Sequence, residues 1–112
     1  MRRDILFLIA APFEDNGKQW FCRDSAMLEG AFAANPQWKK RVELRRVRFR
    51  RPRREVIALL GVDNQTLPAL VLADATAAPE HARRYEEHAF LTDAKAITKY
   101  LAATYGGAGP HP

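Results

Sequence analysis

Apolar residues occur along the chain in short runs that predict strands. Residues 4–9 form an almost wholly apolar run, which is typical of a strand buried on both faces. Two further runs, 67–73 and 89–91, predict strands in the second half of the chain. Residues 41–49 alternate between apolar and polar positions, but the alternation changes phase at Arg45. We interpret this segment as a strand that either contains a bulge or has a buried face beginning only at Arg45.

Three segments carry apolar or small side chains at helical spacing. The first predicts a helix over residues 23–34, which no β-branched residue interrupts. A second helix has Pro52 in its first turn and Gly61 as its C-terminal stop. A third helix follows the last apolar run, and Thr92 or Asp93 caps its N-terminus. Helices therefore connect the early strands and close the domain.

The remaining segments predict connections. Residues 13–21 read as a loop with a turn signal, and residues 74–88 are polar, alanine-rich and without sustained periodicity. The resulting order, βαβαββα, predicts an α/β fold with a single mixed four-stranded sheet and helices on both faces. We expect one domain over residues 1–105. The glycine- and proline-rich residues 106–112 predict a flexible C-terminal tail.

Composition excludes several classes of protein. The chain has 112 residues, 47% of them hydrophobic and 28% charged, which suits one compact domain and not a disordered or fibrous chain. The longest apolar run, 5–11, is too short to cross a bilayer, so we expect no membrane association. One cysteine excludes an intramolecular disulfide and a multi-cysteine metal site, and the three scattered histidines form no metal site. We expect a reducing, cytoplasmic compartment.

Positive charge is concentrated in one stretch. Residues 39–54 contain ten basic residues against one acid, Glu43, and carry +9, whereas the whole chain carries +5. Such a surface attracts acidic proteins or small anions. The simpler interpretation, which we favour here, is a solvated edge strand and turn that charge keeps from pairing with other chains. Nucleic acid is not an expected partner, because no aromatic platform or recognition helix accompanies the arginines.

Three motifs occur in an order typical of a known fold. An aromatic-flanked cysteine, Trp20-Phe21-Cys22, follows the first strand, and Leu67-Pro68 precedes the third. The segment 91–97 opens the last helix with an acidic residue. In these features the chain resembles thioredoxin-like domains of the glutaredoxin and glutathione-transferase N-domain type. The resemblance extends over nearly the whole chain and implies a thioredoxin-like fold.

The chain more closely resembles an uncharacterised family of small bacterial thioredoxin-like proteins. The resemblance rests on the opening Arg-Asp-Ile-Leu-Phe-Leu and on the segments 13–15, 51–53, 64–74 and 110–112. Membership in such a family implies the fold and supplies no known reaction.

Cys22 is the residue on which a reaction would depend. A thiol at a helix N-terminus faces unpaired backbone N–H groups and the positive end of the helix dipole, and both stabilise the thiolate. Ser25 stands where a second cysteine would complete a Cys-x-x-Cys motif, so dithiol chemistry is excluded and an outside thiol such as glutathione must resolve any mixed disulfide. We expect the Ser25 hydroxyl to donate a hydrogen bond to the thiolate. The alternative is an inert thiol that packs as a small hydrophobe.

Other residues are candidates for binding a glutathione-like ligand. The resemblance implies a cis bond before Pro68, which turns the Leu67 backbone toward an extended peptide, and it implies that Asp93 holds the ligand's ammonium group. Arg51 and Arg53 suit a ligand carboxylate or phosphate. The alternatives are a trans proline entering an edge strand, a helix-capping aspartate and solvated arginines.

Two functions follow from these observations. The first is a monothiol redox or glutathione-binding protein that acts through Cys22 and Ser25 and needs no cofactor besides glutathione. The alternative is a non-catalytic adaptor of the same fold that binds an acidic partner through residues 45–54. The sequence leaves open whether the protein is an enzyme, and it leaves open the oligomeric state.

Overall fold

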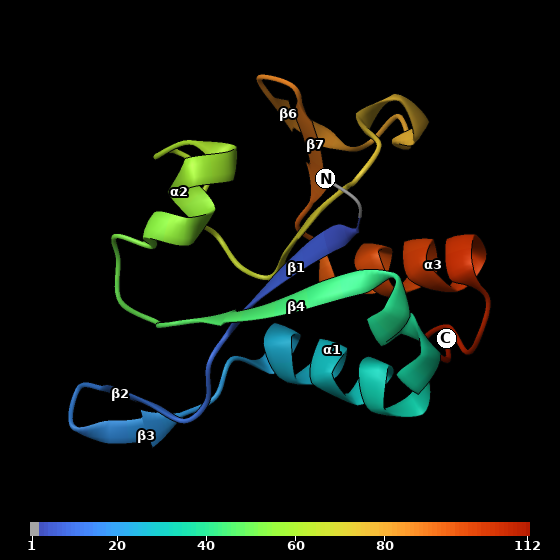
Figure 1. Cartoon of the computed structure of the whole chain (residues 1–112). Coiled ribbons are helices and arrows are strands. Elements are labelled where there is room, and N and C mark those ends of the chain that lie inside the picture. The colour runs from blue at the N-terminus through green and yellow to red at the C-terminus, as the bar shows by residue number, and fades with distance from the viewer. Residues whose placement is uncertain (1–2) are drawn as a thin grey trace.

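The computed structural model describes residues 3–112 and is built on a five-stranded mixed sheet (Figure 1). The strands, in the order in which they lie in the sheet, are β4 (Val42–Val47), β1 (Asp4–Ile9), β5 (Ala69–Val71), β7 (His88–Leu91) and β6 (Arg83–Tyr85). β1 pairs parallel with β4 and antiparallel with β5. β7 pairs antiparallel with both β5 and β6. β1 therefore lies between its parallel partner β4 and its antiparallel partner β5.

Helices cover both faces of this sheet, as the sequence predicted. α1 (Arg23–Ala34) and α3 (Ala94–Tyr105) pack together on one face, and α2 (Arg54–Leu60) lies on the other (Figure 1). Two short 3₁₀ helices, η1 (Pro36–Lys40) and η2 (Ala75–Ala77), complete the element list. No helix within residues 3–112 is long and apolar enough to cross a membrane.

The continuous apolar run of β1 supplies both cores. Every residue of β1 is buried, because successive side chains of a strand point to opposite faces and both faces are covered. Leu6 and Leu8 lie in the cluster with α1 and α3, whereas Phe7 and Ile9 lie in the cluster with α2. The prediction of a strand buried on both faces is confirmed.

Both interpretations of the phase change in β4 were wrong. The register with β1 runs without interruption from Val42 to Val47, so the strand contains no bulge. Val42 and Leu44 belong to the cluster beneath α1 and α3, whereas Val47 and Phe49 belong to the cluster beneath α2. The two sets of alternating apolar residues thus lie on the two opposite faces of one regular strand. One face is buried in the first part of the strand, and the other face is buried from the end of the strand onward.

The predicted number of four strands was also wrong, because β6 adds a fifth strand to the sheet. β6 and β7 form a hairpin whose turn includes Glu86 at a φ of 51°. All three residues of β6 are exposed, so the strand has no apolar alternation from which it could have been predicted.

Residues 13–21 contain a second hairpin where the sequence predicted only a loop. β2 (Phe13–Asp15) and β3 (Lys18–Trp20) pair antiparallel outside the main sheet and extend away from it (Figure 1). Asn16 and Gly17 connect them, both with positive φ, as the two-residue turns of hairpins require. The turn signal was correct, and the strands that it joins are too short and too exposed to show a pattern.

The segment that was predicted as a flexible tail begins with residues bonded to the domain. The side chain of Asn35 donates to the Ala108 carbonyl at 3.0 Å and accepts from the Ala108 amide at 2.8 Å. The indole of the fully buried Trp38 donates to the Gly106 carbonyl at 2.7 Å. These contacts attach residues 106–108 to the end of α1 and to η1.

Candidate functional site

The thiol of Cys22 lies at the N-terminus of α1. Cys22 is the N-cap residue, with an extended backbone, and its carbonyl accepts the first helical hydrogen bond from the Ala26 amide at 2.9 Å. Its Sγ accepts from the Ser25 backbone N–H at 3.4 Å, and the residue is half-buried. The sulfur thus takes the place of the usual N-cap oxygen, where a negative charge is favoured by the free amides and by the helix dipole.

Ser25 is held by a contact of its own. The residue is buried, and its Oγ accepts a hydrogen bond from the Ile9 backbone N–H at 3.0 Å. This bond joins the end of β1 to the first turn of α1 and so fixes the position of the thiol. Ser25 donates to the sulfur through its backbone N–H, so the observed contact is not the hydrogen bond from the Ser25 hydroxyl that the sequence analysis expected.

Cys22 has apolar neighbours on its buried side. Cys22 packs against the cluster under α2, which includes Ile9 and Leu67. Its neighbours in the sequence, Trp20 and Phe21, are exposed, with 47% and 63% of their surface accessible. The Trp20 indole donates to the Asp15 carbonyl of its own hairpin at 2.9 Å, which holds the ring against the hairpin.

The structure places the other residues that were expected to bind a glutathione-like ligand. The Leu67–Pro68 bond is cis, as the resemblance implies, and both residues are buried directly before β5. Asp93 caps α3, because its Oδ2 accepts from the Ala96 amide at 2.8 Å. It also lines a small cavity of about 100 Å³ beside Arg83. The observed contact of Asp93 is therefore the helix cap.

An open groove of about 470 Å³ lies between the end of β4 and the start of α2. We name it the arginine groove. Its lining residues are Arg46, Val47, Arg48, Arg50, Arg51, Pro52, Arg53, Arg54 and Glu55. Six arginines against one glutamate make this a strongly positive concave surface.

Arg53 differs from the other arginines because it is buried, with only 5% of its surface accessible. Its Nε and Nη2 donate to the Phe49 carbonyl, and its Nη1 donates to the Gln65 carbonyl at 2.8 Å. The Gln65 side chain accepts in turn from the Arg53 amide at 2.7 Å. Arg53 therefore joins the loop before α2 to the loop before β5.

The guanidinium of Arg53 is close enough to two other groups to respond to their charge. Burial lowers its pKa from the ordinary arginine value, and the charge of Arg51 lowers it further. The charge of the Cys22 thiolate raises the pKa of Arg53. Of the predicted site residues, the structure brings Arg51 and Arg53 together as lining residues of the arginine groove.

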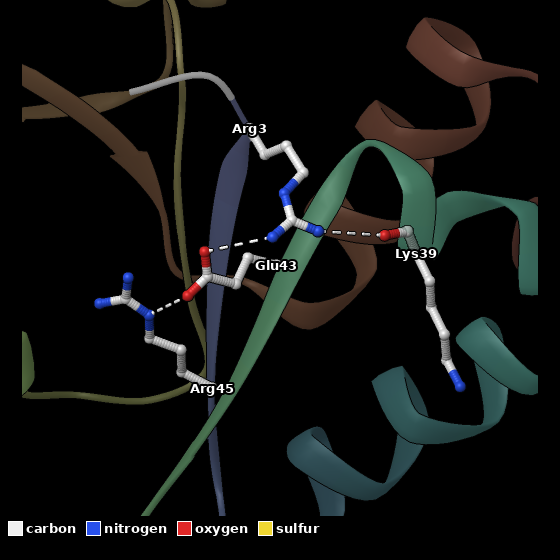
Figure 2. Close-up of polar contacts among 4 residues, drawn as sticks. All are labelled: Arg3, Lys39, Glu43 and Arg45. Atoms are coloured by element: carbon white, nitrogen blue, oxygen red, sulfur yellow. Dashed lines mark hydrogen bonds and ion pairs between the residues drawn. The ribbon is translucent and has the colours of Figure 1, made fainter.

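The acid within the basic stretch does not neutralise the groove. Figure 2 shows Glu43 between Arg3, whose Nη2 is 3.5 Å from Oε1, and Arg45, whose Nε donates to Oε2. Arg3 also donates to the Lys39 carbonyl at 3.4 Å, which holds it at this end of β4. The Arg45 side chain pulls the pKa of Glu43 below its usual value.

Two of the groove arginines have acidic partners from other elements. Arg46 makes a two-pronged ion pair with Glu29 on α1, with both N···O distances at 2.7 Å, and this pair lowers the pKa of Glu29. Arg50 lies 3.8 Å from Glu14 of the hairpin. Within residues 3–112, none of the other four groove arginines is in an ion pair.

Gln65 is a site residue that the sequence analysis missed. It is buried and bonds to Arg53 through both its side chain and its carbonyl. A glutamine in a polar turn carries no signal of such a role, since the partner atoms include backbone carbonyls that every residue possesses.

The chain was compared with models of protein families. The model of the family described as "Protein of unknown function (DUF3088)" matches residues 3–109. The chain belongs to this family. Comparison with curated proteins and with solved structures found no match.

The DUF3088 match spans both candidate sites, the thiol at Cys22 and the arginine groove at 46–55. Both sites therefore lie in the domain that defines the family. The family description names no reaction, so a functional argument depends on the geometry of these sites.

Proposed function

We propose that the protein is a thioredoxin-like monothiol protein that forms a mixed disulfide with glutathione through Cys22. The observation that carries the proposal is the half-buried Sγ at the N-cap of α1, which receives the Ser25 N–H. This environment favours the thiolate, the form of cysteine that attacks a disulfide. The cytoplasm, the compartment expected from the single cysteine, would supply glutathione.

The arrangement of the sheet supports the thioredoxin-like part of this proposal. The strand order β4-β1-β5-β7 combines a parallel pair with two antiparallel neighbours, and α1 leaves directly after β1 and the hairpin. The thiol then lies at the end of β1 that also meets the loop before β5, since Cys22 packs in the cluster containing Leu67.

The reaction proceeds in two exchanges. The Cys22 thiolate attacks one sulfur of oxidised glutathione, the Cys22–glutathione disulfide forms, the glutathione disulfide breaks and one glutathione thiolate leaves. A second glutathione thiolate then attacks the glutathione sulfur of the adduct, re-forms oxidised glutathione and releases the Cys22 thiolate. The cycle has a net product only when the first disulfide attacked is one between glutathione and another thiol, which then leaves in its reduced form. Ser25 has no sulfur to compete for the adduct, so resolution depends on the outside thiol.

Three residues orient the tripeptide in this proposal. The Leu67 backbone beside the cis-proline pairs with the extended ligand. Asp93, whose Oδ2 caps α3, attracts the ligand's ammonium group. Arg51, exposed at the groove, attracts a ligand carboxylate.

Intact-mass analysis tests the proposal. The protein is exposed to oxidised glutathione over a pH series, with Cys22→Ser as the control. We expect one adduct that forms well below about pH 8.5, where an ordinary thiol ionises, and none in the control. An adduct that appears only at alkaline pH, or none at all, would contradict an activated thiol.

The adaptor function remains as the alternative. It requires only that exposed arginines such as Arg48, Arg51 and Arg54 contact an acidic partner, and it needs no reaction at Cys22. A thiol that reacts no faster than a free cysteine would favour it.

A further inference from the structure

The charge at the base of the arginine groove has no acidic partner within residues 3–112. Arg53 is nine-tenths buried, and its guanidinium donates only to the neutral carbonyls of Phe49 and Gln65. A guanidinium has five N–H donors, so two of them remain after these three bonds. Burying a cation is unfavourable unless an anion compensates it. Arg53 is thus a buried positive charge that no carboxylate within residues 3–112 pairs with.

The rim of the groove adds further positive charge. Arg46 and Arg50 are paired with Glu29 and Glu14, so they contribute little net charge. Arg48, Arg51 and Arg54 are exposed and lie around the buried Arg53. With Glu55 as the one lining acid, these four arginines leave a net charge of three.

We propose that the arginine groove binds the phosphate chain of a small di- or triphosphate, with Arg53 at the base and Arg51 and Arg54 at the rim. A single carboxylate brings one negative charge, which one two-pronged arginine contact already balances. A phosphate chain brings several charges and enough oxygens for three or more guanidinium groups. It is also small enough to enter a groove of about 470 Å³.

An acidic protein fits this groove less well than a small anion does. Its side chains would meet the exposed rim arginines, but only a group that enters the groove reaches the buried Arg53.

A nucleic acid strand is also disfavoured. The nearest aromatic ring, Phe49, stacks on Phe13 at 4.2 Å between centroids, and the Arg53 guanidinium lies 5.8 Å from its centroid. That ring is therefore already occupied and offers no platform on which a base can stack.

Titration calorimetry with inorganic tripolyphosphate tests the proposal. The full chain is compared with the double variant Arg51→Gln, Arg54→Gln, which removes two rim charges that make no hydrogen bond in the structure. The matched control is the double variant Arg84→Gln, Lys99→Gln, since both residues are exposed and lie outside the groove. We expect saturable one-to-one binding that the groove variant weakens about tenfold or more and the control leaves nearly unchanged.

The same experiment separates the other outcomes. Cys22→Ser is expected to bind tripolyphosphate normally, so the site stands or falls independently of the thiol. Tighter binding of ADP than of pyrophosphate would identify a nucleotide as the source of the phosphates, and equal binding would identify the phosphate chain alone. Equal weakening in the groove and control variants would overturn the proposal, because it would show only general attraction. So would binding of polyglutamate or single-stranded RNA in the absence of tripolyphosphate binding.

Discussion

Asp4, at the start of β1, joins the N-terminal strand to two distant parts of the chain. The residue is buried, and its Oδ1 accepts from the Ala73 amide at 2.7 Å. Its Oδ2 accepts from the Tyr105 hydroxyl at 2.8 Å, near the end of α3. Asp4→Ala removes both acceptors and leaves two donors without their partner. A hydrogen bond to a charged group contributes about 1.5 kcal/mol or more, so we expect a loss of about 3 kcal/mol.

Urea unfolding of four variants measures this loss. Tyr105→Phe removes one of the two bonds and is expected to lower the free energy of unfolding by about 1.5 kcal/mol. Adding Tyr105→Phe to Asp4→Ala should lower it little further, because the shared bond is already absent. Asp63→Ala, which removes an exposed aspartate, is the matched control and should change stability by less than about 0.5 kcal/mol.

Two results would refute this reasoning. One is an Asp4→Ala variant as stable as Asp63→Ala, which would mean that the buried carboxylate contributes nothing net. The other is strict additivity of Asp4→Ala and Tyr105→Phe, which would mean that the hydroxyl and the carboxylate do not interact in solution.

Three further predictions follow from single contacts. Ser25→Ala leaves the Ile9 amide without its acceptor and should lower the free energy of unfolding by about 1 to 3 kcal/mol, as measured by urea unfolding. An unchanged urea midpoint would mean that the hydrogen bond between Ser25 and Ile9 is absent. Gly61→Ala should destabilise by more than about 1 kcal/mol, because φ is 82° and the new Cβ would lie 2.6 Å from the Tyr85 ring; adding Tyr85→Ala should recover part of the loss. Burial and the Asp4 carboxylate raise the pKa of Tyr105, so the Tyr105 hydroxyl loses its proton at a lower pH in the unfolded chain than in the folded one. The free energy of unfolding should therefore fall as pH rises above about 10, and it should fall less steeply in Tyr105→Phe. Equal slopes in the two proteins would contradict a raised pKa at Tyr105.

The parts of the fold that could be predicted are those in which burial follows sequence periodicity. β1 was recognisable because both of its faces are covered, and α1 occupies the predicted residues 23–34. β6 and the hairpin of β2 and β3 escaped prediction because their side chains are largely exposed, so pairing and not burial determines them. An apolar pattern shows which residues are buried, and it gives little information on short strands whose side chains are mostly exposed.

The candidate site also has one part that could be predicted from the sequence and one part that could not. Cys22 could be placed from the sequence because a helix start follows from local signals, and the structure has it as the N-cap of α1. Arg53 could be named as a candidate, but its burial could not be predicted among ten basic residues in one stretch. That burial depends on carbonyls of Phe49 and Gln65, which come together only when the loops before α2 and β5 meet.

The same loop contact connects the two proposed sites, which also share Arg51. Gln65 fixes Arg53 and stands two residues before Leu67, whose side chain packs in the cluster with Cys22. A phosphate chain bound in the arginine groove would occupy the Arg51 guanidinium that is proposed to attract the glutathione carboxylate. If both proposals hold, a saturating phosphate ligand should therefore slow the reaction of Cys22 with oxidised glutathione, and the slowing should disappear in the variant lacking the Arg51 and Arg54 charges.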